Sequence, residues 1–177
     1  LLRQKSVRIR HIDESIRQLA EDMIATTLDW DRKNEFGAAL AAIQVGEKHK
    51  LTVVRNNFED AEDDEFLTFV NPEIIQKGTG RVVDVEGCLS VPRYYARIPR
   101  ASRIKVKAET IDGEPIRLSL DGFAARVFQH EIDHMNGKLF LDYVKQPSDL
   151  LYLGDDNQLH PAEKIPAEIQ AFIDERR

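Results

Sequence analysis

The feature that most constrains this chain is the pattern His-Glu-x-x-His, which runs from His130 to His134. In a helix the two histidines would lie four residues apart on one face, where their imidazoles could hold one metal ion. Glu131 would lie beside the first histidine, in a position to take a proton from a metal-bound water. The flanks favour a helix, because Asp121 can cap its start and Gly137 can end it in a left-handed conformation.

The pattern alone does not establish a metal site, because a solvated helix face with two incidental histidines would show the same spacing. A third ligand is needed to decide between a metal site and a solvated helix face. Cys88 is the only cysteine of the chain, so it excludes an internal disulfide, and its ordinary role would be that of a small buried hydrophobe. Close to two histidines, its thiolate would instead give three protein ligands and leave one position open, as catalytic metal sites do.

Length and composition limit the class of protein. The 177 residues suit one domain, residues 1–177, and the composition of 42% hydrophobic and 32% charged residues is typical of a globular protein. No apolar run approaches the ~20 residues that cross a membrane, and no secretory signal is visible. The net charge of −6 argues against nucleic-acid binding through a basic face.

Hydrophobic periodicity and turn residues predict an α+β fold. An N-terminal helix is expected from Asp13 to about Asp29, and Pro166 can open a C-terminal helix. Strands are predicted over residues 51–55, 66–70, 74–75, 82–85, 103–110 and 115–120. Turns or loops are predicted at 59–65, 78–80 and 112–113, a turn or strand edge at 71–72, and an extended exit at 139–144. We therefore expect mixed or antiparallel β-sheets packed around a central helix that carries the His-Glu-x-x-His pattern, with N-terminal and C-terminal helices.

Three stretches, in this order and spacing, resemble the signature motifs of peptide deformylases. Residues 37–44 resemble the family pattern G-x-G-L-A-A-x-Q, residues 86–90 match E-G-C-L-S, and residues 129–134 match Q-H-E-x-D-H. The family removes the formyl group from the N-terminal methionine of new proteins. The resemblance runs from the first helix to about Val144, and it implies a metal-dependent hydrolase that acts on formyl-methionyl peptides.

The resemblance implies a role for each matched residue. Cys88, His130 and His134 would bind one divalent metal ion per chain, Fe(II) as is usual in the family, with Zn(II), Ni(II) or Co(II) as substitutes. Glu131 would be the general base. The Gln44 side chain and the Leu89 backbone N–H would stabilise the oxyanion that forms at the formyl group. The residues expected to contact the substrate are Ala38, Ala39, Gly87, Phe123, Arg126 and Val127.

Several of these residues have a competing structural interpretation. On composition alone, Gln44 is the exposed end of a tightly packed turn. Arg126 could equally lie on a solvated helix face, and Phe123 and Val127 could belong to the core. Glu86 and Asp133 would orient the metal ligands, with Arg100 or Arg103 as a partner of Glu86, or would form an ordinary ion pair.

The chain departs from the family pattern at two places. Ala39 stands where the family has its second glycine, and Ile43 stands where it has a proline, so a narrowed cleft could alter rate and substrate preference. Residues 93–97, which we expect to form a loop, also differ, since the family often has a glycine after Val91-Pro92. We interpret that segment as a changed rim of the cleft.

Two other functions stay open on the sequence. A zinc peptidase could share the His-Glu-x-x-His pattern; it would recruit a later glutamate, such as Glu163 or Glu168, and Cys88 would then be idle. A catalytically impaired paralogue that binds metal or a partner would be marked by the changes at Ala39 and Ile43.

Partners and location are predicted from the resemblance. We expect a bacterial-type cytoplasmic enzyme, with an organelle as the alternative location, and no membrane attachment. A transient contact with the ribosome would use the C-terminal segment, which ends in Arg176-Arg177.

Overall fold

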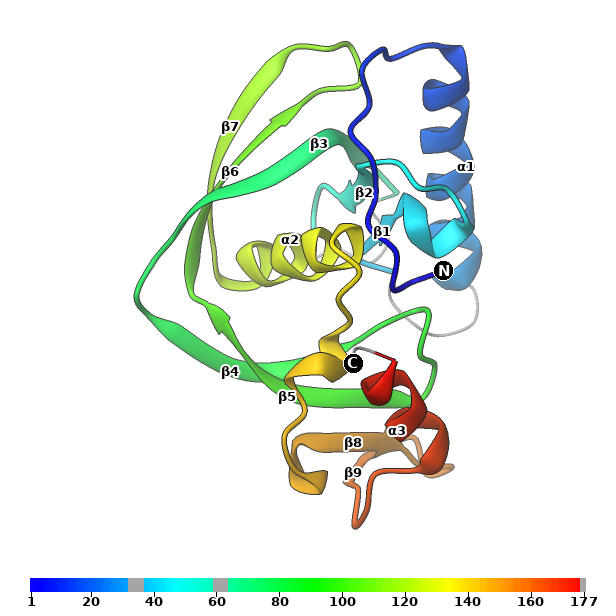
Figure 1. Ribbon diagram of the computed structural model, residues 1–177, viewed down its shortest axis with the longest axis vertical. Coiled ribbons are helices and arrows are strands. Elements are labelled where there is room, and N and C mark those ends of the chain that lie inside the picture. The colour runs from blue at the N-terminus through cyan, green and yellow to red at the C-terminus, as the bar shows by residue number, and fades with distance from the viewer. Residues whose placement is uncertain (32–36, 59–63, 176–177) are drawn as a thin grey trace.

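The computed structural model describes residues 1–31, 37–58 and 64–175 of the chain. Two sheets lie on either side of a central helix, α2 (Gly122–Met135), as Figure 1 shows. One sheet has five strands in the order β1-β2-β3-β6-β7, and the other has four in the order β4-β5-β8-β9. All neighbouring strands of these sheets are antiparallel. The α+β fold with a central helix between sheets is therefore confirmed.

The remaining elements follow the chain in order. The strands are β1 (Ala39–Ala41), β2 (Leu51–Arg55), β3 (Phe66–Lys77), β4 (Arg81–Gly87), β5 (Tyr94–Ala101), β6 (Arg103–Glu109), β7 (Pro115–Asp121), β8 (Leu150–Leu153) and β9 (Leu159–Pro161). The other α-helices are α1 (Glu14–Asp31) and α3 (Ala167–Asp174), and the 3-10 helices are η1 (Ala42–Val45), η2 (Phe140–Tyr143) and η3 (Pro147–Asp149). No helix in the described part of the chain is long and apolar enough to cross a membrane.

The predicted N-terminal helix is confirmed as α1. The Asp13 carboxylate accepts hydrogen bonds from the Ile16 N–H at 3.2 Å and the Ser15 hydroxyl at 2.6 Å, as a capping residue does. One apolar face of the helix, with Ile16, Ala20 and Met23, packs against residues of β1 and β2 in a buried cluster. The C-terminal helix is confirmed as well, because its predicted apolar side packs in a separate cluster that includes residues of β5 and η2.

Packing sets the rotation of α2. Ala125, Phe128 and Ile132 lie in the core cluster formed with the five-stranded sheet, and the rings of Phe128 and Phe69 meet edge to face at 4.9 Å. Because this stripe faces one sheet, other positions of the helix face the four-stranded sheet. His130 belongs to that second group, since its Nδ1 contacts a carboxylate of β4.

The two ends of α2 differ in how they are closed. Asp121 precedes the helix as predicted and its backbone is extended, but among the described residues its side chain makes no capping hydrogen bond. At the other end Gly137 has a φ of +70°, its N–H donates to the His134 carbonyl at 3.0 Å, and the Lys138 N–H donates to the Asp133 carbonyl at 2.9 Å. This pair of bonds is a Schellman motif, so the predicted glycine end is confirmed.

The N-terminal segment lies against this end of the helix. The Ser6 N–H donates to the Met135 carbonyl at 2.8 Å, and Lys5 forms an isolated bridge with Asn136. The backbone of Arg3 approaches Gly137 so closely that a Cβ there would lie 2.4 Å from the Arg3 carbonyl oxygen. Glycine is therefore required at this position for two reasons, conformation and space.

We expect Gly137→Ala to lower the free energy of unfolding by about 2–4 kcal/mol, because it combines a left-handed residue with a backbone collision. Urea unfolding measures this loss. The matched control is Gly122→Ala at the start of α2, where φ is +54° and no atom lies within 4 Å of the added Cβ. Equal losses in the two variants would show that the contact with Arg3 has no energetic weight.

Several sequence predictions of secondary structure are wrong in detail. β3 continues through Asn71-Pro72, where we expected a turn or the edge of a strand. Asn71 has a φ of +53° and the register with β6 shifts there, so the strand bends without ending. Residues 139–144 contain η2 in place of an extended exit. Residues 93–97 mostly belong to β5, and β8 and β9 follow Pro147, where no strand was predicted.

The Asp112-Gly113 hairpin is confirmed between β6 and β7. The predicted acidic loop connects the antiparallel strands β2 and β3, and its residues 59–63 lie outside the described residues.

Candidate metal centre

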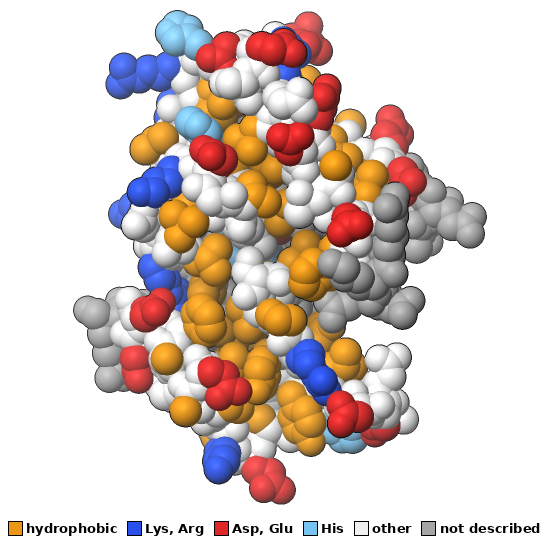
Figure 2. Space-filling model, turned by 90° about the vertical axis from the view of Figure 1, so that its right-hand side faces the viewer, with side chains coloured by type: hydrophobic (Ala, Val, Ile, Leu, Met, Phe, Trp, Pro, Cys, Tyr) orange, Lys and Arg blue, Asp and Glu red, His pale blue; other side chains and the backbone are white. Residues whose placement is uncertain are grey.

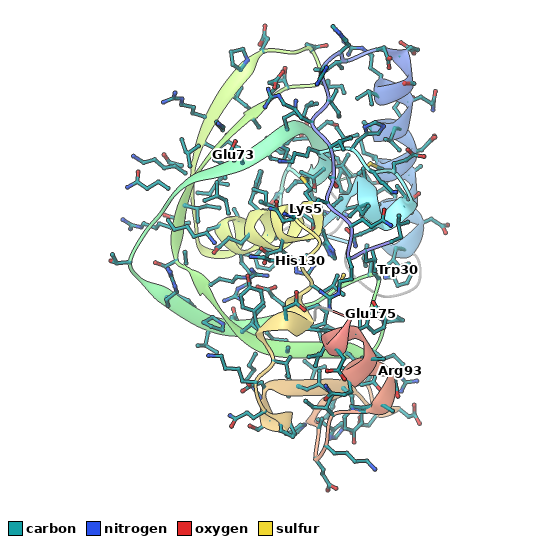
Figure 3. All side chains as sticks on the ribbon, viewed as in Figure 1. Lys5, Trp30, Glu73, Arg93, His130 and Glu175 are labelled. Carbon is teal, nitrogen blue, oxygen red and sulfur yellow. The ribbon has the colours of Figure 1, made fainter. Side chains whose placement is uncertain are left out.

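Three metal-ligating atoms converge on the side of α2 that faces β4, where Figure 3 labels His130. They are the Cys88 Sγ, which follows the end of β4, and ring nitrogens of His130 and His134, and all lie within 4.8 Å of one another. The His134 Nε2 is 3.1 Å from the His130 Nε2 and 3.3 Å from the Cys88 Sγ. Among the described residues, this is the one such group of three or more side chains. The structure thus brings together the three ligands predicted from sequence.

The spacing and chemistry of this set fit a transition metal ion. Around a tetrahedral ion with metal–nitrogen and metal–sulfur bonds of about 2.0–2.3 Å, neighbouring donor atoms lie about 3.3–3.6 Å apart. The two separations from the His134 Nε2, 3.1 and 3.3 Å, are close to these values. A thiolate with two imidazoles suits iron, zinc, cobalt or nickel and does not suit magnesium or calcium.

The cluster favours the ligating form of the cysteine. Burial raises the pKa of the Cys88 thiol, but the charge of His134 and the hydrogen bonds from both histidines outweigh burial and hold that pKa well below its ordinary value. The thiolate is the form of cysteine that binds metal.

A buried carboxylate fixes the orientation of His130. Glu86 accepts two hydrogen bonds from Arg100, at 2.8 and 3.0 Å, and one from Arg126 at 2.7 Å. Its Oε2 also lies 3.1 Å from the His130 Nδ1. Burial opposes the charge of Glu86, but the hydrogen bonds from His130 and Arg100 prevail and lower its pKa to about 2. A carboxylate behind a ligating imidazole holds the ring in place and raises its basicity.

The same arginine joins a second carboxylate of α2. Arg100 bonds to Asp133, whose Oδ2 also accepts a hydrogen bond from the Tyr143 hydroxyl at 2.8 Å. The Arg100 guanidinium lies over the Tyr143 ring, 4.5 Å from its centre. Of the two arginines considered from sequence, Arg100 is thus the partner of Glu86, and Arg103 is exposed. Tyr143 was missed, because its role depends on where η2 returns to the helix.

Two further side chains face the cluster, one with a free acceptor oxygen and one with hydrogen-bond donors. The side chain of Glu131 is buried, its Oε2 has no hydrogen-bond partner among the described residues, and burial raises its pKa. The Gln44 Oε1 accepts the Ala41 N–H at 2.8 Å, which directs the Nε2 to the Ser90 hydroxyl at 3.1 Å and the Cys88 sulfur at 3.7 Å. Gln44 is therefore half-buried with its donors aimed at the cluster, in place of the exposed turn end that its local sequence suggested.

A cavity of about 500 Å³ opens beside these groups, and Gln44, Cys88, Leu89, His130 and Glu131 all line it. Its volume is that of a small-molecule or peptide side-chain pocket. In the described part of the chain, the Leu89 N–H makes no backbone hydrogen bond, so it is available to a ligand.

The six residues expected to contact substrate all line this cavity: Ala38, Ala39, Gly87, Phe123, Arg126 and Val127. Arg126 is buried rather than solvated, and its guanidinium donates to the carbonyls of Val82 and Ile98 as well as to Glu86. Val127 also belongs to the core cluster, so it is both a core residue and part of the cavity wall. A side chain at Gly87 would meet the Tyr95 ring at 2.6 Å.

Comparison with known proteins decides the family. A family model described as polypeptide deformylase matches residues 1–149. The chain belongs to the peptide deformylase family. A peptide deformylase of Thermomicrobium roseum is 42% identical over 161 residues, which cover 89% of this chain and 88% of that protein. A peptide deformylase of Mesorhizobium japonicum is 40% identical over 146 residues, 82% of this chain and 80% of that protein.

Solved peptide deformylases share the fold. The crystal structure from Legionella pneumophila has a TM-score of 0.73 and 38% identity, and the match covers 81% of this chain and 80% of that one. The Synechococcus elongatus structure, in complex with actinonin, has a TM-score of 0.74 and 38% identity, with 81% and 75% covered. The region matched by the family model holds all three deformylase motifs, whereas β8, β9 and α3 follow it.

Proposed function

We propose that this chain is a peptide deformylase that hydrolyses the N-formyl group of nascent polypeptides. Water and a formyl-methionyl peptide give formate and a peptide with a free methionine amine. The observation that carries the proposal is the convergence of the Cys88, His130 and His134 donor atoms beside the unpaired carboxylate oxygen of Glu131, at a cavity of about 500 Å³. Neither Glu163 nor Glu168, the ligands that a zinc peptidase would need, belongs to this group.

Cys88, His130 and His134 would hold one divalent ion, and we infer Fe(II), with Zn(II), Ni(II) or Co(II) as substitutes. When bound, such an ion supplies Lewis acidity, which lowers the pKa of water to about 7 and polarises a carbonyl oxygen. Glu86 keeps the Nε2 of His130 directed at the shared centre by holding its Nδ1.

Proton transfer falls to Glu131. Its unpaired Oε2 accepts a proton from the attacking water and then donates it to the amine of the departing methionine. Burial raises the pKa of this carboxyl and so strengthens it as a base. The same carboxyl group first accepts the proton and then donates it to the amine, so no second acid is needed.

The Gln44 Nε2 and the Leu89 N–H are the donors for the negative charge that develops on the formyl oxygen. The Ala41 N–H holds the Gln44 amide from its other end, so this donor is oriented before substrate arrives. A donor fixed in this way is worth on the order of 3 kcal/mol of barrier.

The methionine side chain fits the apolar part of the cavity, with Ala38, Ala39, Phe123 and Val127 among its walls. Ile43 packs in the core with Met135 and is not among the residues that line the cavity, so its side chain takes no room from the pocket. Ala39 does line it, and its methyl would reduce the room beside the substrate backbone.

The test is formate release from a formyl-Met peptide by protein stripped of metal and reloaded anaerobically with Fe(II), Ni(II) or Zn(II). An N-acetyl-Met peptide serves as the control substrate. We expect Cys88→Ser to lose most of its bound metal, measured by elemental analysis, and with it turnover, because a serine hydroxyl is a poor ligand for these ions. No formate from wild-type protein with a full metal complement would overturn the proposal.

Two further parts of the proposal concern the setting. We propose that the enzyme works in a bacterial-type cytoplasm, on chains as they emerge. Contact with the ribosome stays a prediction; Arg176 and Arg177, on which it was based, lie outside the described residues. Co-sedimentation with ribosomes, compared before and after removal of α3, tests it.

A further inference from the structure

One wall of the cavity comes from beyond the region that the family model matches. Leu153, Asn157 and Leu159 line the cavity beside the residues already described. All three belong to the β8–β9 hairpin, residues 150–161, whereas the family match ends at residue 149. In Figure 1 this hairpin lies next to β5, on the side away from α2.

Arg93 holds the hairpin in place. Its guanidinium donates to the Leu153 carbonyl at 3.0 Å and to the Asp155 carboxylate at 2.7 Å, and its own carbonyl accepts the Leu153 N–H at 2.8 Å. Arg93 has a φ of +68°, a conformation that L side chains rarely adopt. This is the place where deformylases often have glycine, so the side chain that replaces it is used to fix the hairpin.

Strand order gives the distance from the metal ligands to this wall. β5 lies between β4, which leads into Cys88, and β8, so β8 is two strand spacings from β4, about 10 Å. An extended peptide advances about 3.3 Å per residue. The hairpin is therefore within reach of the third residue of a formylated peptide, while the formyl-methionine occupies the end near Cys88.

The hairpin offers apolar surface to that residue. Leu153 is half-buried and Leu159 is 41% exposed, and both line the cavity. In Figure 2, hydrophobic side chains run down the middle of the face shown and into the lower part of the molecule, which carries the four-stranded sheet and α3. An apolar substrate side chain placed there would remove both its own surface and that of the leucines from water.

We propose that the β8–β9 hairpin, held by Arg93, is a specificity-determining wall that selects an apolar residue at the third position of the formylated peptide. The inference rests on the proposed deformylase function and adds to it a preference beyond the methionine.

The experiment compares formyl-Met-Ala-Leu-amide with formyl-Met-Ala-Ser-amide as substrates. Wild-type protein should favour the leucine peptide on the order of fivefold in kcat/KM, the amount expected for partial burial of one leucine. Leu159→Ser should remove most of this preference by raising KM for the leucine peptide with kcat unchanged. Ile75→Ser is the matched control, because Ile75 is 43% exposed on β3 and does not line the cavity.

Arg93 provides an independent variant. Arg93→Gly suits the backbone conformation and removes the side-chain contacts, so it should keep the fold and lose the preference. Arg93→Lys, which retains a donor for the Leu153 carbonyl, should restore part of it.

Calorimetric binding of the same two peptides to metal-loaded Glu131→Gln protein, alone and combined with Leu159→Ser, separates this inference from the deformylase function. A binding preference without any wild-type turnover would overturn the function and support the hairpin wall. Turnover with a third-residue preference that is unchanged in both Leu159→Ser and Arg93→Gly would overturn the hairpin wall and leave the function standing.

Discussion

Glu131→Gln is expected to lower kcat by about 10²–10⁴-fold and to leave metal binding intact. The amide keeps the shape of the side chain but cannot accept a proton from water or return one to the amine. Because Glu131 belongs to neither the ligand set nor the Glu86 network, the metal site should be preserved.

Steady-state formate release and metal stoichiometry, measured on the same preparation, check both halves of this expectation. Glu21→Gln makes the same chemical change on an exposed position of α1 and should behave as wild type. Turnover of Glu131→Gln within tenfold of wild type would mean that another group carries the proton.

Glu86→Gln is expected to lower the free energy of unfolding by about 3–5 kcal/mol, because it leaves two buried guanidinium groups without their shared carboxylate. Arg100 and Arg126 are each about 5% exposed or less, so water cannot replace the lost partner. For a chain of this size the loss corresponds to a fall in Tm of roughly 6–20 °C. Metal affinity should fall as well, by about 10–100-fold, because the His130 Nδ1 loses its acceptor.

Thermal unfolding and a competition assay with a metal chelator measure these two effects. The control is Glu73→Gln, which breaks an exposed ion pair between Glu73 of β3 and Lys107 of β6 and should cost no more than about 1 kcal/mol. If both variants unfolded at the same temperature, the buried network would contribute no more than a surface pair.

The convergence of the three candidate metal ligands could be predicted from sequence because each of them is carried by a short motif. His130 and His134 need only one helix to share a face, and periodic apolar residues with a terminal glycine predict that helix. Placing Cys88 beside them required the order and spacing of three motifs, since no local pattern brings β4 to α2.

Contacts that depend on the return path of the chain could not be predicted. Tyr143 reaches Asp133 only because η2 folds back along α2, and the segment was expected to be extended. β8 and β9 are four and three residues long, so they carry too little alternation to be recognised, and their pairing depends on contacts of β8 with β5 and of β9 with β8. Arg93 looked like part of a rim loop, although its side chain holds a whole hairpin.

The contact between the N-terminal segment and the end of α2 has a consequence for the timing of folding during synthesis. Ser6 and Met135 are roughly 130 residues apart in the chain, yet their backbones are hydrogen-bonded. At typical elongation rates this separation corresponds to on the order of ten seconds. The segment around Ser6 must wait that long for its partner, so the end of the helix that carries the two histidines can be closed only after that interval. A nascent chain stalled before Gly137 would expose both the unpaired segment and an unfinished ligand helix.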